Sequence, residues 1–272
     1  MRNIIRMDFY RLISSRSFKV SMFLVFIISL LSKPIYKFII TFLNNITQQV
    51  AESGDSSINV AEATINYPAT VDFSTILCSP FGYTLLIVLC LICAIGFAYA
   101  DIAHGYIKNY AGQLSNKGYT VISKFTVIGF LNLFYLVAAL IGSTVGEMLV
   151  RKVVFDSDIP EGILTFFLKL LLMQSLCAIL LFFTVGIKQK TAATVAGVVL
   201  GSGMLGLAYI GLNTAVHKIF NVDSFNVNDY APDSLLESSG KLVAVNALVV
   251  SIVIIAIFLP LTVKIFSKSD VK

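Results

Sequence analysis

The apolar residues of this chain gather into long runs that polar stretches separate. Two of these runs, 73–100 and 125–146, contain no Asp, Glu, Lys or Arg. At about 1.5 Å per helical residue, each run is long enough to cross a hydrocarbon core of about 30 Å. The whole pattern predicts an all-α membrane protein with six spans, at about residues 20–43, 80–103, 125–149, 162–187, 191–216 and 242–263.

The first 19 residues differ from the span that follows them. They carry five basic residues, and their apolar residues Ile5, Phe9, Leu12 and Ile13 recur at spacings of three and four positions. This pattern predicts a helix over residues 1–19 that lies in the membrane interface, with its cations toward lipid headgroups and water.

The polar stretches alternate in charge. The N-terminal segment, residues 104–124, the turn after the fourth span and the C-terminal tail together hold 13 of the 20 basic residues. The segments 44–79, 150–161 and 217–241 instead hold 11 of the 15 acidic residues. Because basic segments stay on the cytoplasmic side, this alternation predicts a cell-membrane protein with both termini inside and three outer loops.

Composition agrees with one transmembrane domain over residues 1–272. The chain is 57% apolar and 13% charged, whereas soluble proteins average about 25% charged residues. The net charge of +5 does not indicate a nucleic-acid partner, because the basic residues alternate with spans instead of forming a patch. The four cysteines lie in or beside apolar runs, where they act as small apolar side chains.

No motif for chemistry on this chain is present. The sequence has no phosphate-binding GxxxxGK[ST] and no HExxH, and the two histidines, His104 and His217, fall on opposite sides of the membrane. The CxxC at Cys90 and Cys93 lacks the two further ligands that a zinc site needs. We therefore expect no catalytic residue, no metal and no cofactor bound by this chain, and a membrane-embedded enzyme is the least favoured function.

A few polar residues within or at the ends of the spans are candidates for a substrate path: Lys33, Lys37, Glu147, Lys169 and Gln174. Each is also explained as an anchor at the membrane edge. Asp101, near the cytoplasmic end of the second span, is a candidate gating or interface acid. It either pairs with a nearby Arg or Lys or relays protons. Pro34 predicts a bend in the first span.

The basic segment 104–124 contains a short amphipathic pattern. Ile107, Tyr110 and Leu114 share one helical face, and Lys108, Asn109 and Gln113 lie on the other. Such a helix docks in a groove of another protein or lies on lipid, since both need one apolar face.

A resemblance favours docking. The basic N-terminal helix, the six spans and the motif Asp-x-x-x-Gly-Tyr-Ile-Lys-Asn at residues 101–109, followed by Ser-Lys-Phe at 123–125, resemble the ABC-2 type permease family. Within that family the chain is most similar to permeases of bacterial exporters for peptide antibiotics, lantibiotic self-immunity and cytolytic peptides. Asp101 and Tyr106 stand where the family usually has Glu and Thr or Ser.

The resemblance implies a transport subunit without an ATPase of its own. A separate ATP-binding subunit would hold ATP and Mg, a second permease chain, identical or related, would complete the path, and the N-terminal helix would be the connecting helix. The segment 104–124 would contain the coupling helix, seated on the ATPase by Gly105, Tyr106, Ile107, Lys108, Asn109, Tyr110 and Leu114. The substrate would be hydrophobic or amphipathic, such as an antimicrobial or cytolytic peptide, consistent with the few charges inside the spans.

Two other classes stay open. A membrane scaffold or sensor would bind a cytoplasmic partner without dependence on nucleotide. An ion-coupled secondary carrier would show paired halves and charges at the bilayer midplane, and we find no convincing repeat of this kind. The pairs Gly142 with Gly146 and Gly197 with Gly201 match GxxxG, which is typical of close helix contact but indicates no particular dimer face.

Overall fold

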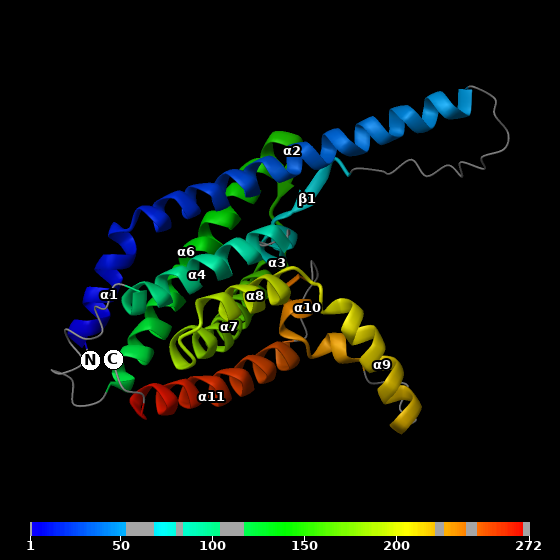
Figure 1. The fold of residues 1–272 in the computed structure, drawn as a ribbon. Helices are drawn as coiled ribbons and strands as arrows, with labels where there is room; N and C mark the ends of the chain where they lie inside the picture. The colour runs from blue at the N-terminus through cyan, green and yellow to red at the C-terminus, as the bar shows by residue number, and fades with distance from the viewer. Residues whose placement is uncertain are drawn as a thin grey trace.

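The structure is a computed structural model that describes residues 2–52, 68–79, 84–103, 117–220, 226–237 and 244–268. Its elements are mostly helices (Figure 1). In chain order they are α1 Arg2–Ser14, α2 Arg16–Glu52, β1 Thr70–Asp72, α3 Phe73–Cys78, α4 Thr84–Ala103, α6 Gly118–Val150, β2 Lys152–Val154, α7 Ile159–Leu181, the π-helix η1 Phe182–Gly186, α8 Lys190–Gly201, α9 Gly206–Phe220, the 3-10 helix η2 Val227–Asp229, α10 Pro232–Glu237 and α11 Ala244–Lys268.

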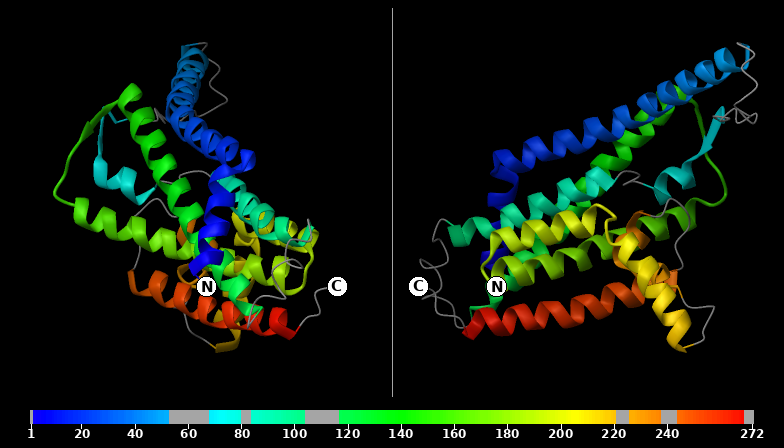
Figure 2. Two further views of the ribbon diagram at one scale, coloured as in Figure 1. Left: turned by 90° about the vertical axis from the view of Figure 1, so that its left-hand side faces the viewer. Right: turned by 45° about the vertical axis from the view of Figure 1, so that its right-hand side comes forward.

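The long helices run back and forth between two ends of a bundle (Figures 1 and 2). One end holds α1, the end of α4, the start of α6 and the end of α11, whereas β1, α3 and the end of α2 lie toward the other. Within the described residues, five helices are long and apolar enough to cross a membrane, and a bent pair makes six if it forms one span. The most buried of them is α7. The chain is therefore a helical membrane-embedded protein, as its composition predicts.

The corner between α1 and α2 is made by Ser15. Its hydroxyl accepts a hydrogen bond from the backbone N–H of Phe18 at 3.2 Å and donates one to the carbonyl of Leu12 at 2.8 Å. A serine at this position caps the start of α2. Leu12 is buried against the core, whereas Ile13, which the spacing placed on the same face, is 39% exposed.

The first GxxxG pair lets α6 pack against the backbone of α2. A Cβ added to Gly142 would lie 2.6 Å from the carbonyl oxygen of Phe26, and one added to Gly146 would lie 2.5 Å from that of Leu30. Real Cβ atoms do not approach backbone oxygens this closely, so only glycine fits at both positions. Small residues at this spacing allow such close helix contact. This pair therefore packs two helices within the chain.

The contact at Gly146 coincides with a proline in α2. Pro34 has no N–H, so it cannot donate to the carbonyl four residues earlier, which is that of Leu30. The helix nevertheless continues through Pro34 to Glu52, nine residues beyond the predicted end of the first span. Gly146 presents its Cα to the carbonyl that Pro34 leaves unused, where a Cα–H···O contact is available.

The second GxxxG pair packs α8 on α4. A Cβ on Gly201 would meet the Cα of Val88 at 3.1 Å, and one on Gly197 would meet the Cδ1 of Ile95 at 2.9 Å. The backbone contact at Gly201 leaves less room to adjust than the side-chain contact at Gly197. Both glycine pairs thus serve contacts between helices of this chain.

The predicted fifth span, 191–216, is not one helix. It consists of α8 and α9, which meet at an angle of 71°. Gly203 has φ 66°, a left-handed conformation that ends helices and that glycine adopts without strain. The sequence Gly-Ser-Gly at 201–203 supplies this break, which hydropathy alone does not reveal.

Two of the predicted outer loops contain secondary structure. β1 and β2 form a parallel pair, with Thr70 opposite Lys152, so a short sheet joins the segments 44–79 and 150–161 of an otherwise helical fold. The backbone N–H and hydroxyl of Ser74 in α3 donate to the Asp156 carboxylate at 3.2 and 2.5 Å. The hydroxyl donation in particular holds the pKa of Asp156 below its ordinary value.

Candidate functional site

A cluster of charged residues joins three helices at the α1 end of the bundle. The Arg11 guanidinium of α1 lies 2.6 Å from one Asp101 carboxylate oxygen, and the Lys124 ammonium of α6 lies 2.7 Å from the other. The Ser123 hydroxyl of α6 donates to the Asp8 carboxylate of α1 at 2.6 Å. Asp101, from α4, is therefore the centre of an ion-paired junction between α1, α4 and α6.

The junction is buried. The side chains of Asp101 and Lys124 are 3% and 1% exposed, whereas that of Arg11 is 30% exposed and reaches water. Lys124 also lies 5.0 Å from the ring centroid of Phe97 in α4, within range of a cation–π contact. Buried charges persist only when they are paired and hydrogen-bonded. Asp101, weighed from the sequence as an ion-pair partner or a proton relay, is thus held by two cations.

The helices before and after the segment predicted to dock on a partner meet at this junction. Asp101 lies two residues before the end of α4, and Lys124 lies in the second turn of α6. Residues 118–124, expected in the surface segment 104–124, form the first turns of α6. The proposed docking residues lie outside the described residues: Gly105, Tyr106, Ile107, Lys108, Asn109, Tyr110 and Leu114.

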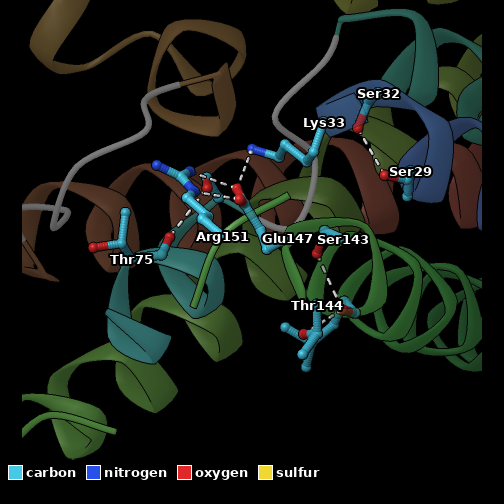
Figure 3. A network of polar contacts seen from close by, with 10 residues as sticks. Ser29, Ser32, Lys33, Thr75, Ser143, Thr144, Glu147 and Arg151 are labelled. Carbon is cyan, nitrogen blue, oxygen red and sulfur yellow. Dashed lines mark hydrogen bonds and ion pairs between the residues drawn. The ribbon is translucent and has the colours of Figure 1, made fainter. Parts of the chain in front are cut away.

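A second cluster lies at the other end of α6 (Figure 3). The Glu147 carboxylate pairs with the Lys33 ammonium of α2 at 3.2 Å and accepts two hydrogen bonds from the Arg151 guanidinium. The ammonium of Lys37 donates to the carbonyl of Val150 at 3.3 Å. Three of the candidate path residues are therefore engaged in contacts that join α2 to the end of α6.

The two clusters stand a membrane thickness apart. Lys124 and Glu147 are 23 positions apart in the same helix, which corresponds to about 35 Å at 1.5 Å per residue. A hydrocarbon core is about 30 Å thick. This spacing favours a role as membrane-edge anchors for Lys33, Lys37 and Glu147.

Gln174 lies deeper and joins α7 to α6. Its amide donates to the carbonyl of Phe125 at 2.7 Å, and its carbonyl accepts from Asn132 at 2.9 Å. Asn132 also lies 3.5 Å from the sulfur of Cys177. Lys169, on the same helix, is buried at 1% exposure near α3. Of the candidate path residues, these two lie on α7, the most buried of the long helices.

The position of Gln174 gives a prediction. Gln174→Leu should lower the free energy of unfolding by about 1 kcal/mol, within the range of about 0.6 to 1.7 kcal/mol for hydrogen bonds between membrane helices. Stability can be measured by titration of mixed micelles with a denaturing detergent. The double variant with Asn132→Leu should lose little more than the single one, because both remove the same bond. Unchanged stability would contradict a structural role for this hydrogen bond. Gln174 would then remain a candidate residue of the substrate path.

Sequence reasoning missed most of the buried junction. Lys124 was expected at a surface, Arg11 was counted only among the basic residues of the N-terminal helix, Ser123 entered only as part of the Ser-Lys-Phe motif, and Asp8 was not singled out. One available indication was that Asp8 is the one acid among five basic residues in the first 19 positions. An isolated acid in a basic helix indicates a specific contact. Here that contact is with Ser123, whose hydroxyl donates to the Asp8 carboxylate.

Within the described part of the chain, no three His, Cys, Asp or Glu side chains are placed to hold a metal ion. The long apolar helices, with charged clusters at two levels, define a membrane-embedded helical protein. The chain matches no protein-family model and no curated protein.

Proposed function

We propose that this chain is the permease subunit of an ATP-binding cassette exporter in a bacterial cytoplasmic membrane. In this proposal the α1 end of the bundle faces the cytoplasm, and a separate ATPase subunit with ATP and Mg docks there. A second permease chain, identical or related, completes the path. The α1 end is also where the basic segments of the chain converge, which supports this orientation under the positive-inside rule.

The observation that carries the proposal is the junction of Arg11, Asp101 and Lys124. It joins the last turn of α4 and the second turn of α6, so the two helices that flank the segment 104–116 are fixed to each other. It also joins α1. A displacement of that segment by a partner would therefore move three helices together, which is what coupling of ATPase closure to a membrane path requires.

The apolar character of the helices supports a proposal for the cargo. The ion pairs of Asp101 and Glu147 lie toward the two ends of α6, and apart from the buried Lys169 the residues of the helices between them are mostly apolar. Such helices do not replace the hydration shell of a small hydrophilic ion. We therefore propose a hydrophobic or amphipathic cargo, such as an antimicrobial or cytolytic peptide, moved outward or out of the bilayer for export or self-immunity.

The docking assignment has a direct test. The chain is purified with a candidate ATPase, and complex formation and ATP hydrolysis are measured for Ile107→Ala, Tyr110→Ala and Leu114→Ala. We expect each change to weaken the complex about tenfold or more, the loss of about 1.4 kcal/mol or more that truncation of a buried interface anchor produces. Phe155→Ala, at the opposite end and 70% exposed, is the matched control and should leave the complex intact.

The result also separates the alternatives. A complex that ignores all three substitutions would contradict docking through this segment. A complex that forms but shows no dependence on nucleotide in either binding or transport would indicate the scaffold or sensor function instead.

A further inference from the structure

A cavity of about 310 Å³ lies beside the ion-paired junction. The corner between α1 and α2 forms one side, α4 forms the other, and Leu131 and Tyr135 of α6 form its floor. Its size is at the lower end of the range of about 300–1,000 Å³ for small-molecule sites. Gly96 lies at its open edge, where the backbone of α4 is exposed.

The cavity has an apolar part and a polar part. Leu12, Phe18 and Phe97 line it together with the residues of the floor, whereas Arg11, Ser15 and Ser17 line it at the helix corner. Such a division suits the polar head and part of one acyl chain of a lipid. Arg11 and Ser17 are its hydrogen-bond donors, because the Ser15 hydroxyl already donates to the Leu12 carbonyl, and a planar guanidinium matches the oxygens of a phosphate.

The charges around the polar part favour an anionic head. Asp101 is already paired with two cations, and Asp8 is buried and accepts from Ser123. Burial, opposed by Lys124, raises the pKa of Asp8. Arg16 and Lys19 are exposed at the start of α2 and add to the positive potential.

We propose that this cavity binds an anionic amphiphile with a phosphate head, placing the head at Arg11 and the Ser17 hydroxyl and an acyl chain against Leu12, Phe18 and Phe97. The bound molecule would fill the space between the α1–α2 corner and α4. This proposal stands apart from the transport function, because it needs neither an ATPase nor a second permease chain.

Cys93 reports on occupancy of this cavity. It lines the cavity and is partly exposed, whereas Cys78, Cys90 and Cys177 are buried. The full chain is placed in nanodiscs of phosphatidylcholine, with or without phosphatidylglycerol, and treated with N-ethylmaleimide, which is uncharged. Mass spectrometry then gives the rate of alkylation at Cys93. We expect phosphatidylglycerol to slow alkylation of Cys93 about tenfold. Occupancy slows the reaction by the factor 1 + [L]/Kd, which is about ten when the lipid concentration is near ten times its Kd.

Two variants at Gly96 separate occupancy from a general effect of membrane charge. A Cβ added at Gly96, which lines the cavity, meets no atom within 4 Å, so a side chain at this position begins in open space. Gly96→Ala should keep the protection by phosphatidylglycerol. Gly96→Leu should occupy the chain site and reduce the protection ratio to about one, as expected when binding is lost.

Each outcome decides the proposal. Slower alkylation with phosphatidylglycerol, lost in Gly96→Leu and kept in Gly96→Ala, supports it. Equal rates in both lipids would overturn it, and so would protection that persists in Gly96→Leu. Inorganic phosphate added to phosphatidylcholine nanodiscs should give no protection, and if it protects as well as the lipid, the site is for a free anion and the amphiphile is wrong.

Discussion

Gly146→Ala is expected to lower the free energy of unfolding by about 2 kcal/mol, within the range of about 1–3 kcal/mol for an overpacked interior. The new Cβ would lie 2.5 Å from the carbonyl oxygen of Leu30, which belongs to the backbone of α2 and cannot rotate away. The two helices must separate for the methyl group to fit. Gly142→Ala meets the carbonyl of Phe26 in the same way, so the double variant should lose more.

The matched control is Gly129→Ala in the same helix. Its Cβ would meet the Gln174 side chain at 3.5 Å, an ordinary contact, and alanine is favoured over glycine in a helix by up to about 1 kcal/mol. This control should be neutral or more stable than the natural chain. Detergent titration of the purified proteins measures both changes, and equal stability of Gly146→Ala and Gly129→Ala would contradict the close packing of α2 on α6.

Asp101→Asn should have a still larger effect, about 3 kcal/mol or more, because removal of one partner from a buried ion pair costs about 3–5 kcal/mol. The amide has nearly the same shape as the carboxylate but no charge. Lys124 would remain at 1% exposure without its principal counter-charge. The same detergent titration measures the loss, and the change should also release α1 from the bundle.

A second substitution tests whether the charge is the cause. Lys124→Met in the Asp101→Asn background removes the buried cation, and Arg11 is 30% exposed and can be hydrated. We expect the double variant to recover most of the lost stability, giving a large coupling energy in the double-mutant cycle. Additive losses from the two substitutions would show that Asp101 and Lys124 contribute separately.

The long helices could be predicted because their cause is local. Long apolar runs in lipid satisfy their backbone as helices, and α4, α7 and α11 lie where those runs predict. The break between α8 and α9 was missed because hydropathy averages over the glycines that cause it. The start of α6 was also missed, because Lys124 reads as a surface charge until its partners are known.

The contacts between helices could not be predicted in the same way. Gly142 and Gly197 both begin a GxxxG pair, yet one meets a backbone oxygen and the other the end of a side chain. The GxxxG spacing indicates that another helix can pack closely at these glycines. Which helix does so is determined by the fold. Asp8 and Ser123 likewise lie 115 positions apart, and nothing local connects them.

The corner at Gly203 constrains where the lipid can be. Across the 71° turn the last carbonyls of α8 and the first N–H groups of α9 cannot bond as they would within one helix. Some of them bond locally, since Ser202 donates to the carbonyls of Val198 and Val199 and the N–H of Gly206 donates to that of Gly203. Acyl chains offer the rest no hydrogen bonds. Residues 202–205 must therefore be wetted or covered by polypeptide. The belt of acyl chains around this protein is consequently interrupted at that corner and does not form a complete ring.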